Sequence, residues 1–262
     1  MSAFKEFDIK WGMVVDLDKC TGCGACMVSC QVENNIAPME DASNKLRTLS
    51  WMLVYKLENG LKYPEHDVAY LPRPCMQCGH PSCVSVCPVV ATDKNENGGI
   101  VSQVYPRCIG CRYCMAACPY HSRYFGWFDP HWPEGMEKTL TPFVSTRPRG
   151  VVEKCTFCHH RWNLAKEKAR KEGGDPNSLP DGAYVPACAE ACPTGAISFG
   201  DLKNPEHKVH ELHKSKYARR ILERLGTDPQ VYYMSKRSWV LDLLDNDMGD
   251  GSHGSNGGGH HG

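Results

Sequence analysis

Four closely spaced cysteines near the middle of the chain constrain its fold more than any other feature. They lie in the stretch CIGCRYCMAACP, where Cys108, Cys111, Cys114 and Cys118 have the spacing C-x2-C-x2-C-x3-C. In two-cluster iron–sulfur proteins, the first three thiolates of such a run hold one cubane cluster and the fourth binds the neighbouring cluster. Pro119 follows directly and ends the helix, because an interior proline would lose a backbone hydrogen bond and clash. The run therefore predicts a second, reciprocal run.

Three more runs of the same kind flank the central one. In the first, Gly22 and Gly24 permit a tight loop, because glycine adopts left-handed backbone conformations at no steric cost. The second has four residues between its middle cysteines, and the fourth is split by a long spacer. Their cysteines are Cys20, Cys23, Cys26 and Cys30; Cys75, Cys78, Cys83 and Cys87; and Cys155, Cys158, Cys188 and Cys192.

Composition narrows the chemistry of these runs to iron–sulfur ligation. All 16 cysteines of the 262 residues fall within the four runs. Disulfide scaffolds belong to short secreted chains, and structural zinc uses paired C-x2-4-C knuckles. Four clusters with four ligands each use every cysteine. The formal net charge is zero, so no general attraction to nucleic acid is expected.

The order of the runs indicates how they share clusters. We expect runs two and three to form one ferredoxin-like unit, and runs one and four to form the other, with the fourth cysteine of each run exchanged. The expected ligand sets are Cys20, Cys23, Cys26 with Cys192; Cys155, Cys158, Cys188 with Cys30; Cys75, Cys78, Cys83 with Cys118; and Cys108, Cys111, Cys114 with Cys87. The long spacer leaves other partners open for the split run.

Three histidines lie close to the runs. His80 falls inside the second run, and His159 and His160 follow Cys158. Four thiolates already complete each site. We therefore expect His80 to be a solvent-exposed loop residue, and His159 and His160 to lie beside a site or at the surface without binding a cluster.

Short strands and helices are expected between the runs, which predicts the α+β fold class. The expected architecture is two ferredoxin-like bis-cluster units in a pseudo-two-fold arrangement, with long loops and a C-terminal extension. Its parts are 11–34 with 151–202 as the first unit, 74–128 as the second unit, 35–73 and 129–150 as inserts, 203–248 as a partner-contacting extension, and 249–262 as a disordered tail.

Individual elements are predicted from apolar patterning and turn signals. Asn59-Gly60 and the stretch 97–99 indicate hairpin turns, because such dipeptides suit tight turns. The other expectations are a buried strand at 11–17, aromatic packing over a cluster at 120–128, a solvated helix at 161–172, an amphipathic helix at 205–225, a strand at 231–234, and an apolar patch at 238–245.

Taken together, the runs resemble those of a known family. Their order, the wide gap in the second and the split fourth are similar to the electron-transfer subunits of complex iron–sulfur molybdoenzymes, such as dimethyl sulfoxide, polysulfide and tetrathionate reductases. The resemblance spans residues 11–235 and is carried by DKCTGC, PCMQCGHPSC, CIGCRYCMAACPY, EKCTFC and ACAEACPTGAI. The long inserts and the GTDPQVYYM ending look most like the iron–sulfur subunits of menaquinone reductase complexes.

This resemblance implies an electron relay between partner subunits. One partner would be a large molybdopterin-type or related subunit, the other an integral-membrane quinone-binding subunit, and a multihaem cytochrome subunit is a further candidate. It implies that the Cys20 set lies at the large-subunit end and the Cys108 set nearest the membrane. Because no ligand is missing, four [4Fe-4S] clusters are expected, with one [3Fe-4S] cluster as the alternative. No catalytic residue is expected on this chain.

The location of the protein is predicted from the absence of a recognisable signal peptide or membrane helix in the sequence. The N-terminal MSAFKEFDIKWG has neither an apolar core nor twin arginines, and no apolar run reaches the roughly 18 residues of a membrane helix. We expect a peripheral protein held at a membrane by partners. The resemblance favours the periplasmic side, reached on an exported partner, and the cytoplasmic side is the alternative.

Two other functions compete with that of a relay subunit. A free polyferredoxin serving soluble partners is the alternative function, and the apolar SWVLDLLD patch favours a docked subunit over it. An autonomous enzyme is disfavoured, because the chain has no GxGxxG after a strand, no Walker loop and no triad-like arrangement.

Overall fold

The largest sheet joins strands from both ends of the chain. The structure, a computed structural model, describes residues 8–38, 49–95 and 98–246. The sheet has the order β8-β1-β10-β9, and β1 lies antiparallel to β8 and parallel to β10. Its strands are β1 Trp11–Asp16, β8 Ile197–Asp201, β9 Ala218–Arg219 and β10 Val231–Met234. The strands expected at 11–17 and 231–234 are thus confirmed.

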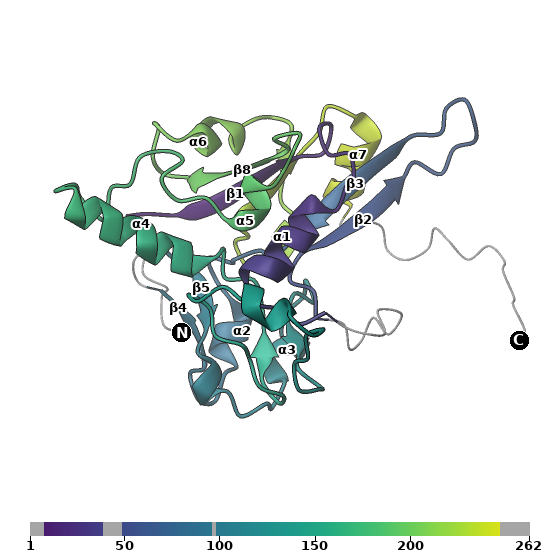
Figure 1. Cartoon of the computed structure of the whole chain (residues 1–262). Helices are drawn as coiled ribbons and strands as arrows, with labels where there is room; N and C mark the ends of the chain where they lie inside the picture. Colours follow the sequence, from purple (N-terminus) through teal and green to yellow (C-terminus); the bar gives the residue numbers. More distant parts are fainter. Residues whose placement is uncertain (1–7, 39–48, 96–97, 247–262) are drawn as a thin grey trace, which may run out of the picture.

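Two pairs of helices carry cysteines of the four runs. α1 (Ala25–Glu33) packs against α5 (Ala187–Glu190), beside the large sheet. α2 (Ser82–Ser85) packs against α3 (Tyr113–Ala116) in the lower part of the molecule as drawn in Figure 1. The helix that contains Cys30 continues to Glu33, because no proline follows that cysteine.

Small two-stranded sheets complete the described parts of the chain. They pair β2 (Leu53–Glu58) with β3 (Val68–Arg73), β4 (Thr92–Lys94) with β5 (Val101–Gln103), and β6 (Tyr124–Phe125) with β7 (Val152–Glu153). The β4–β5 pair confirms the hairpin expected at 97–99, although residues 96 and 97 of its turn lie outside the described residues. This mixture of short helices and strands is the expected α+β class.

The β2–β3 hairpin differs from its prediction in the length of its turn. Glu58 pairs with Val68, so nine residues, 59–67, connect the strands where a two-residue turn at Asn59-Gly60 was expected. The Asn59 side chain organises this loop: its Oδ1 accepts from the amides of Leu61 and Asp67 at 3.2 and 3.0 Å. Asparagine is thus a turn residue here, but through its side chain.

The helix expected over 205–225 is wrong. A short helix, α6, covers only Lys208–Leu212, and β9 and the 3-10 turn Glu223–Leu225 follow it. Leu222 has a φ of 53°, a left-handed conformation that an α-helix cannot contain. The apolar periodicity arises instead from separate contacts, and Ile221 is buried in the main core.

The SWVLDLLD patch forms helix α7 (Ser238–Asp245) and packs on its own chain. Val240 and Leu244 are buried in the main core, and Trp239 and Leu243 pack against it. The patch therefore gives no support to a docked subunit. The predicted disordered tail, 249–262, lies outside the described residues.

The two remaining sequence expectations hold only in part. In the aromatic stretch 120–128, Tyr120 is buried, but Trp127 and Phe128 are exposed. The helix expected at 161–172 is α4 (His159–Lys171), and its Trp162 is buried beneath the Lys166 ammonium, 3.7 Å from the ring centroid.

None of the helices in the described residues has the length and apolar character needed to cross a membrane. Two further 3-10 turns cover Tyr105–Arg107 and Met136–Thr139.

Candidate iron–sulfur sites

The first group of thiols surrounds a pocket where the loop before α1 meets the segment after α5. Cys20, Cys23, Cys26 and Cys192 all line this pocket, with apolar neighbours. Burial raises the pKa of Cys26 to about 11, and the thiols of Cys20, Cys192 and Cys23 add to the rise. Gly22 has a φ of +71°, and a Cβ there would lie 2.6 Å from the Tyr70 ring, so only glycine fits this loop.

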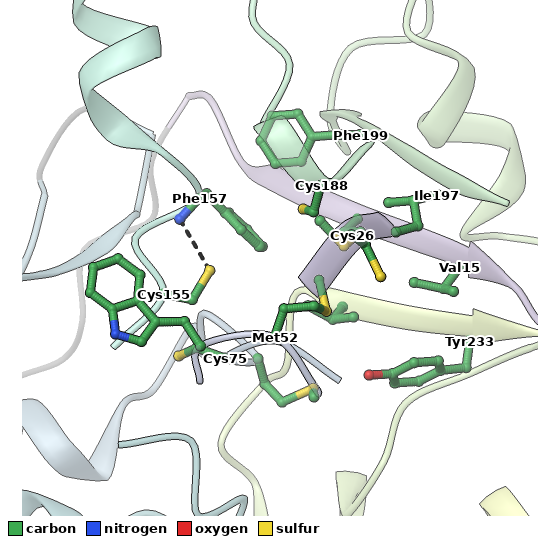
Figure 2. Close-up of a cluster of buried hydrophobic side chains, with 14 of the residues drawn as sticks. Val15, Cys26, Met52, Cys75, Cys155, Phe157, Cys188, Ile197, Phe199 and Tyr233 are labelled. Carbon is green, nitrogen blue, oxygen red and sulfur yellow. Dashed lines mark hydrogen bonds between the residues drawn. The ribbon is translucent and has the colours of Figure 1, made fainter. Parts of the chain in front are cut away.

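The second group lies deeper, where α1 meets the split run. Burial raises the pKa of Cys30 well above its usual value, and the thiols of Cys155, Cys158 and Cys188 contribute to this rise. The Asn34 amide donates to the sulfurs of both Cys30 and Cys158 at 3.7 Å. In Figure 2 the Phe157 amide points at the Cys155 sulfur, with an N–S distance of 3.4 Å. The structure thus brings Cys30 to the split run.

The third group joins the second and third runs. Burial raises the pKa of Cys78, and the thiols of Cys75, Cys83 and Cys118 contribute. Cys75, Cys83 and Cys118 are themselves buried. The fourth cysteine of the central run therefore lies with the first three of the second run.

The fourth group includes Cys108 and Cys114, which lie in a second, smaller core. Cys108 packs in the small core formed by Cys83, Cys114 and Val152, and the Val152 amide donates to the Cys108 sulfur at 3.5 Å. Burial raises the pKa of Cys114, and the Cys108 thiol adds to this rise.

The two other cysteines of the fourth set have different surroundings. Cys87 is partly buried, which by itself would raise its pKa, but backbone amides including that of Ala91 donate to its sulfur and lower the pKa overall. Cys111 is exposed at the tip of the loop. The place of Cys87 and Cys111 in this set rests on the spacing rule.

Thiols of neighbouring groups lie close enough to interact electrostatically, in a fixed order. The first and second groups share helix α1, and the Cys26 thiol contributes to the raised pKa of both Cys30 and Cys188. Figure 2 shows Cys188 close to Cys26. Between the second and third groups, the Cys75 thiol contributes to the raised pKa of Cys155. Between the third and fourth groups, the Cys83 thiol contributes to the raised pKa of Cys114. The four groups therefore form one series through the molecule.

The donor set fits iron–sulfur clusters better than single ions. Within the ranges that the structure describes, no three His, Cys, Asp or Glu side chains converge on a point where one metal ion could bind. A single Zn²⁺ needs all its thiolates about 2.3 Å away. Each of the four groups consists of cysteine thiols, which are the ligands that hold iron–sulfur clusters.

Two of the three histidines near the runs have hydrogen-bond partners, whereas the Nδ1 of His159 is buried without one in the described part of the chain. His160 is buried, and its Nε2 lies 2.7 Å from Glu33 Oε1. Arg161 donates to both carboxylate oxygens of Glu33, at 2.6 and 2.8 Å, and these bonds lower the pKa of Glu33. The contacts join α4 to the end of α1. His80 is exposed, as expected, and its Nδ1 lies 3.3 Å from the Gly226 carbonyl.

Sequence reasoning missed the polar groups that lie among the thiols. Arg123 is buried and donates to the Cys83 sulfur at 3.0 Å. Lys154 is buried, and its ammonium donates to the carbonyl oxygens of Val101 and Cys155. Neither position carries a spacing signal.

Two family models match the chain. Both describe a 4Fe-4S dicluster domain, over residues 19–91 and 66–132. The chain therefore contains the dicluster, ferredoxin-like kind of iron–sulfur domain. The match over 66–132 covers the second and third runs, and the match over 19–91 covers the first and second.

Relatives along the whole chain narrow the family. The chain is 79% identical, over 94% of its length and 96% of the relative, to the menaquinone reductase iron–sulfur cluster-binding subunit of Nitratidesulfovibrio vulgaris. It is 37% identical to a putative dimethyl sulfoxide reductase iron–sulfur subunit of Halobacterium salinarum, covering 92% and 86% of the two proteins. It is 34% identical to one polypeptide of the polysulfide reductase of Wolinella succinogenes, covering 87% and 95%.

The chain belongs to the family of iron–sulfur electron-transfer subunits of menaquinone, dimethyl sulfoxide and polysulfide reductase complexes. Members are subunits of larger complexes and carry electrons, so the resemblance seen in the sequence is confirmed. The alternative of a free polyferredoxin is not supported by these relatives.

Proposed function

We propose that this chain is the iron–sulfur subunit of a quinone-linked reductase complex, and that it holds four [4Fe-4S] clusters. The four ligand sets are those expected from the spacing, with Cys20, Cys30, Cys75 and Cys108 each in a different set. Bound clusters supply one-electron transfer. Support comes from the dicluster matches and from thiol neighbours that agree with the exchanged fourth cysteines.

The bis-cluster units follow from the same proposal. One unit comprises 11–34 with 151–202 and the other 74–128, related by a pseudo-two-fold arrangement. The packing of α1 on α5 and of α2 on α3 supports it, since each pair joins the two runs of one unit. A [3Fe-4S] cluster at one position is the alternative, but every position has four cysteines.

The observation that carries the relay is the single series of thiol groups. Electrons would enter or leave at the Cys20 group and at the Cys108 group, which lie at its two ends. Apolar side chains are exposed at both ends: Val28 and Val32 on α1, and Ile109 and Tyr113 beside Cys108. Exposed apolar surface of this kind suits contact with partner proteins.

Partners of two kinds fit these ends. A large molybdopterin-type or related subunit, or a cytochrome donor, would contact the Cys20 end. An integral-membrane quinone-binding subunit would contact the Cys108 end. The chain's own residues position the thiols, and the quinone chemistry takes place on the membrane subunit, because a quinone needs two electrons and two protons.

Location follows from these partners. The protein would be peripheral and held at the membrane by the complex, with 203–248 as a further contact segment. The periplasmic side is favoured through an exported partner, and the cytoplasmic side is the alternative. Protease accessibility in intact spheroplasts distinguishes the two.

The isolated chain is expected to accept electrons without turning over a substrate. Anaerobic protein should be bleached by dithionite and recover its colour in air, yet reduce no menaquinone analogue above the rate of dithionite alone. Addition of membranes that contain the partner subunits but lack this chain should restore quinone-linked turnover. Quinone reduction by the isolated chain would contradict the proposal.

A further inference from the structure

Among the described residues, one buried arginine has no carboxylate to balance its charge. Arg123 lies directly before β6 and is 3% exposed. Its Nη1 donates to Thr92 Oγ1 and Gln103 Oε1, each at 3.1 Å, and its Nη2 donates to the Cys83 sulfur at 3.0 Å. Two of these three acceptors are neutral oxygens and the third is a thiol.

The charged surroundings of Arg123 consist of cysteines. The groups that stabilise its charged form most are the thiols of Cys83, Cys114 and Cys75. Within the part of the chain that the structure describes, its Nε–H is buried without an acceptor. A donor of the guanidinium is therefore left over at the junction of the third and fourth thiol groups.

A second buried arginine, Arg147, has a carboxylate partner. Arg147 is equally buried, and its Nε donates to Glu153 Oε2 at 3.0 Å. Burying a charge without a partner costs several kcal/mol, so buried charges are normally paired. An anionic group held by the thiols around Arg123 would supply the missing counter-charge.

We propose that Arg123 is a fixed cation that raises the reduction potential of the cluster held by Cys75, Cys78, Cys83 and Cys118. The inference rests on the proposed function, since it needs a cluster at that position. One-electron reduction, with the electron supplied by the donor subunit or by dithionite, adds one negative charge and makes or breaks no bond. A buried cation favours the more negative state, because little water screens it.

Two contacts predict which cluster's reduction potential depends most on Arg123. Arg123 donates directly to Cys83, and Cys75 of the same group is among its neighbours, whereas only Cys114 represents the fourth group. Hydrogen bonds to cluster sulfurs and net charge are recognised determinants of potential. The third position should therefore shift most, the fourth less, and the two positions in the α1–α5 unit not at all.

The test is a redox titration of the anaerobic complex, followed by electron paramagnetic resonance. Arg123→Gln should make one midpoint potential more negative by a ten-fold change in the reduction equilibrium or more, which is about 59 mV for one electron. Arg123→Lys keeps the charge and should recover most of this shift. Arg107→Gln removes an exposed arginine next to Cys108 and should leave all potentials unchanged, because water screens that charge.

A second measurement needs no substitution in the pocket. With ¹⁵N-arginine incorporated into the wild-type protein, pulsed resonance of the reduced state should show a ¹⁵N hyperfine coupling to one cluster. If Arg123→Gln does not assemble, this coupling decides the matter: its presence supports the contact at Cys83, and its absence overturns it.

The outcomes separate the inference from the function on which it rests. Four clusters with unchanged potentials in Arg123→Gln would overturn the role of Arg123 alone. A wild-type protein without a cluster at the Cys75 position would overturn the proposed function, and the inference with it.

Discussion

Replacing Cys111 by alanine is expected to remove one cluster and abolish quinone-linked activity in the complex. Cys111 lies at the exposed tip of the central run, in the thiol group at one end of the series. Loss of its thiolate leaves three ligands, so about four of roughly sixteen iron atoms should be lost. The other three thiol groups keep all their cysteines. Dithionite should therefore still reduce the variant, while menaquinol-linked turnover falls to the background of the assay.

A neighbouring position serves as the control for this variant. Ile109 lies in the same loop and is 66% exposed, but it offers no ligand. Ile109→Ala should keep the full iron content. If Cys111→Ala kept full quinone-linked activity, the Cys108 group would not be the end that faces the quinone subunit, and the proposed order would have to be abandoned.

Replacing Arg147 by methionine is expected to cause the largest loss of stability among non-cysteine positions. Arg147 pairs with Glu153, and the two side chains are 2% and 4% exposed. It also donates to the carbonyl oxygens of Asn34 and Asn35 at 2.5 and 3.0 Å, which closes the end of α1. Removal leaves Glu153 buried and unpaired, which costs about 3–5 kcal/mol. The thermal midpoint should fall by on the order of 10 °C.

The double variant isolates the cause of this loss. Arg147→Met with Glu153→Met removes both charges, and replacing a buried ion pair by apolar side chains is often close to neutral. The double variant should therefore be more stable than Arg147→Met alone, at the same scan rate and under anaerobic conditions. If both variants were equally unstable, the backbone contacts of Arg147 would matter more than its ion pair.

Cysteine spacing predicted which thiols are neighbours better than apolar patterning predicted the fold. Neighbouring thiols in the structure agree with the exchange of Cys30 and Cys118 between runs, because this exchange depends on a short loop and one helical turn. Both are local features. The strand at 11–17 was also readable, since a short apolar run bounded by turn signals leaves few alternatives.

Elements whose structure depends on distant contacts could not be predicted from the sequence. The periodicity over 205–225 indicated one helix, but Leu222 is left-handed and the segment forms a strand beside β10. The SWVLDLLD segment looked like a docking patch and instead fills its own core. In the first case the predicted helix is wrong, and in the second only the surface that the apolar side chains contact was unknown.

Buried charges were the other gap between sequence and structure. Most of the predicted insert 129–150 is exposed, yet Arg147 in it is buried. Arg123 likewise follows a cysteine run without a motif of its own. A sequence shows that a residue is charged, but its burial depends on which segments fold over it.

The number of iron atoms per chain tests the central claim most directly. Protein purified anaerobically should contain about sixteen iron atoms and a matching amount of acid-labile sulfide, because sixteen cysteines at four per cluster make four cubane clusters. It should also contain no stoichiometric zinc. About eight iron atoms, or zinc in place of iron, would contradict the four-cluster relay.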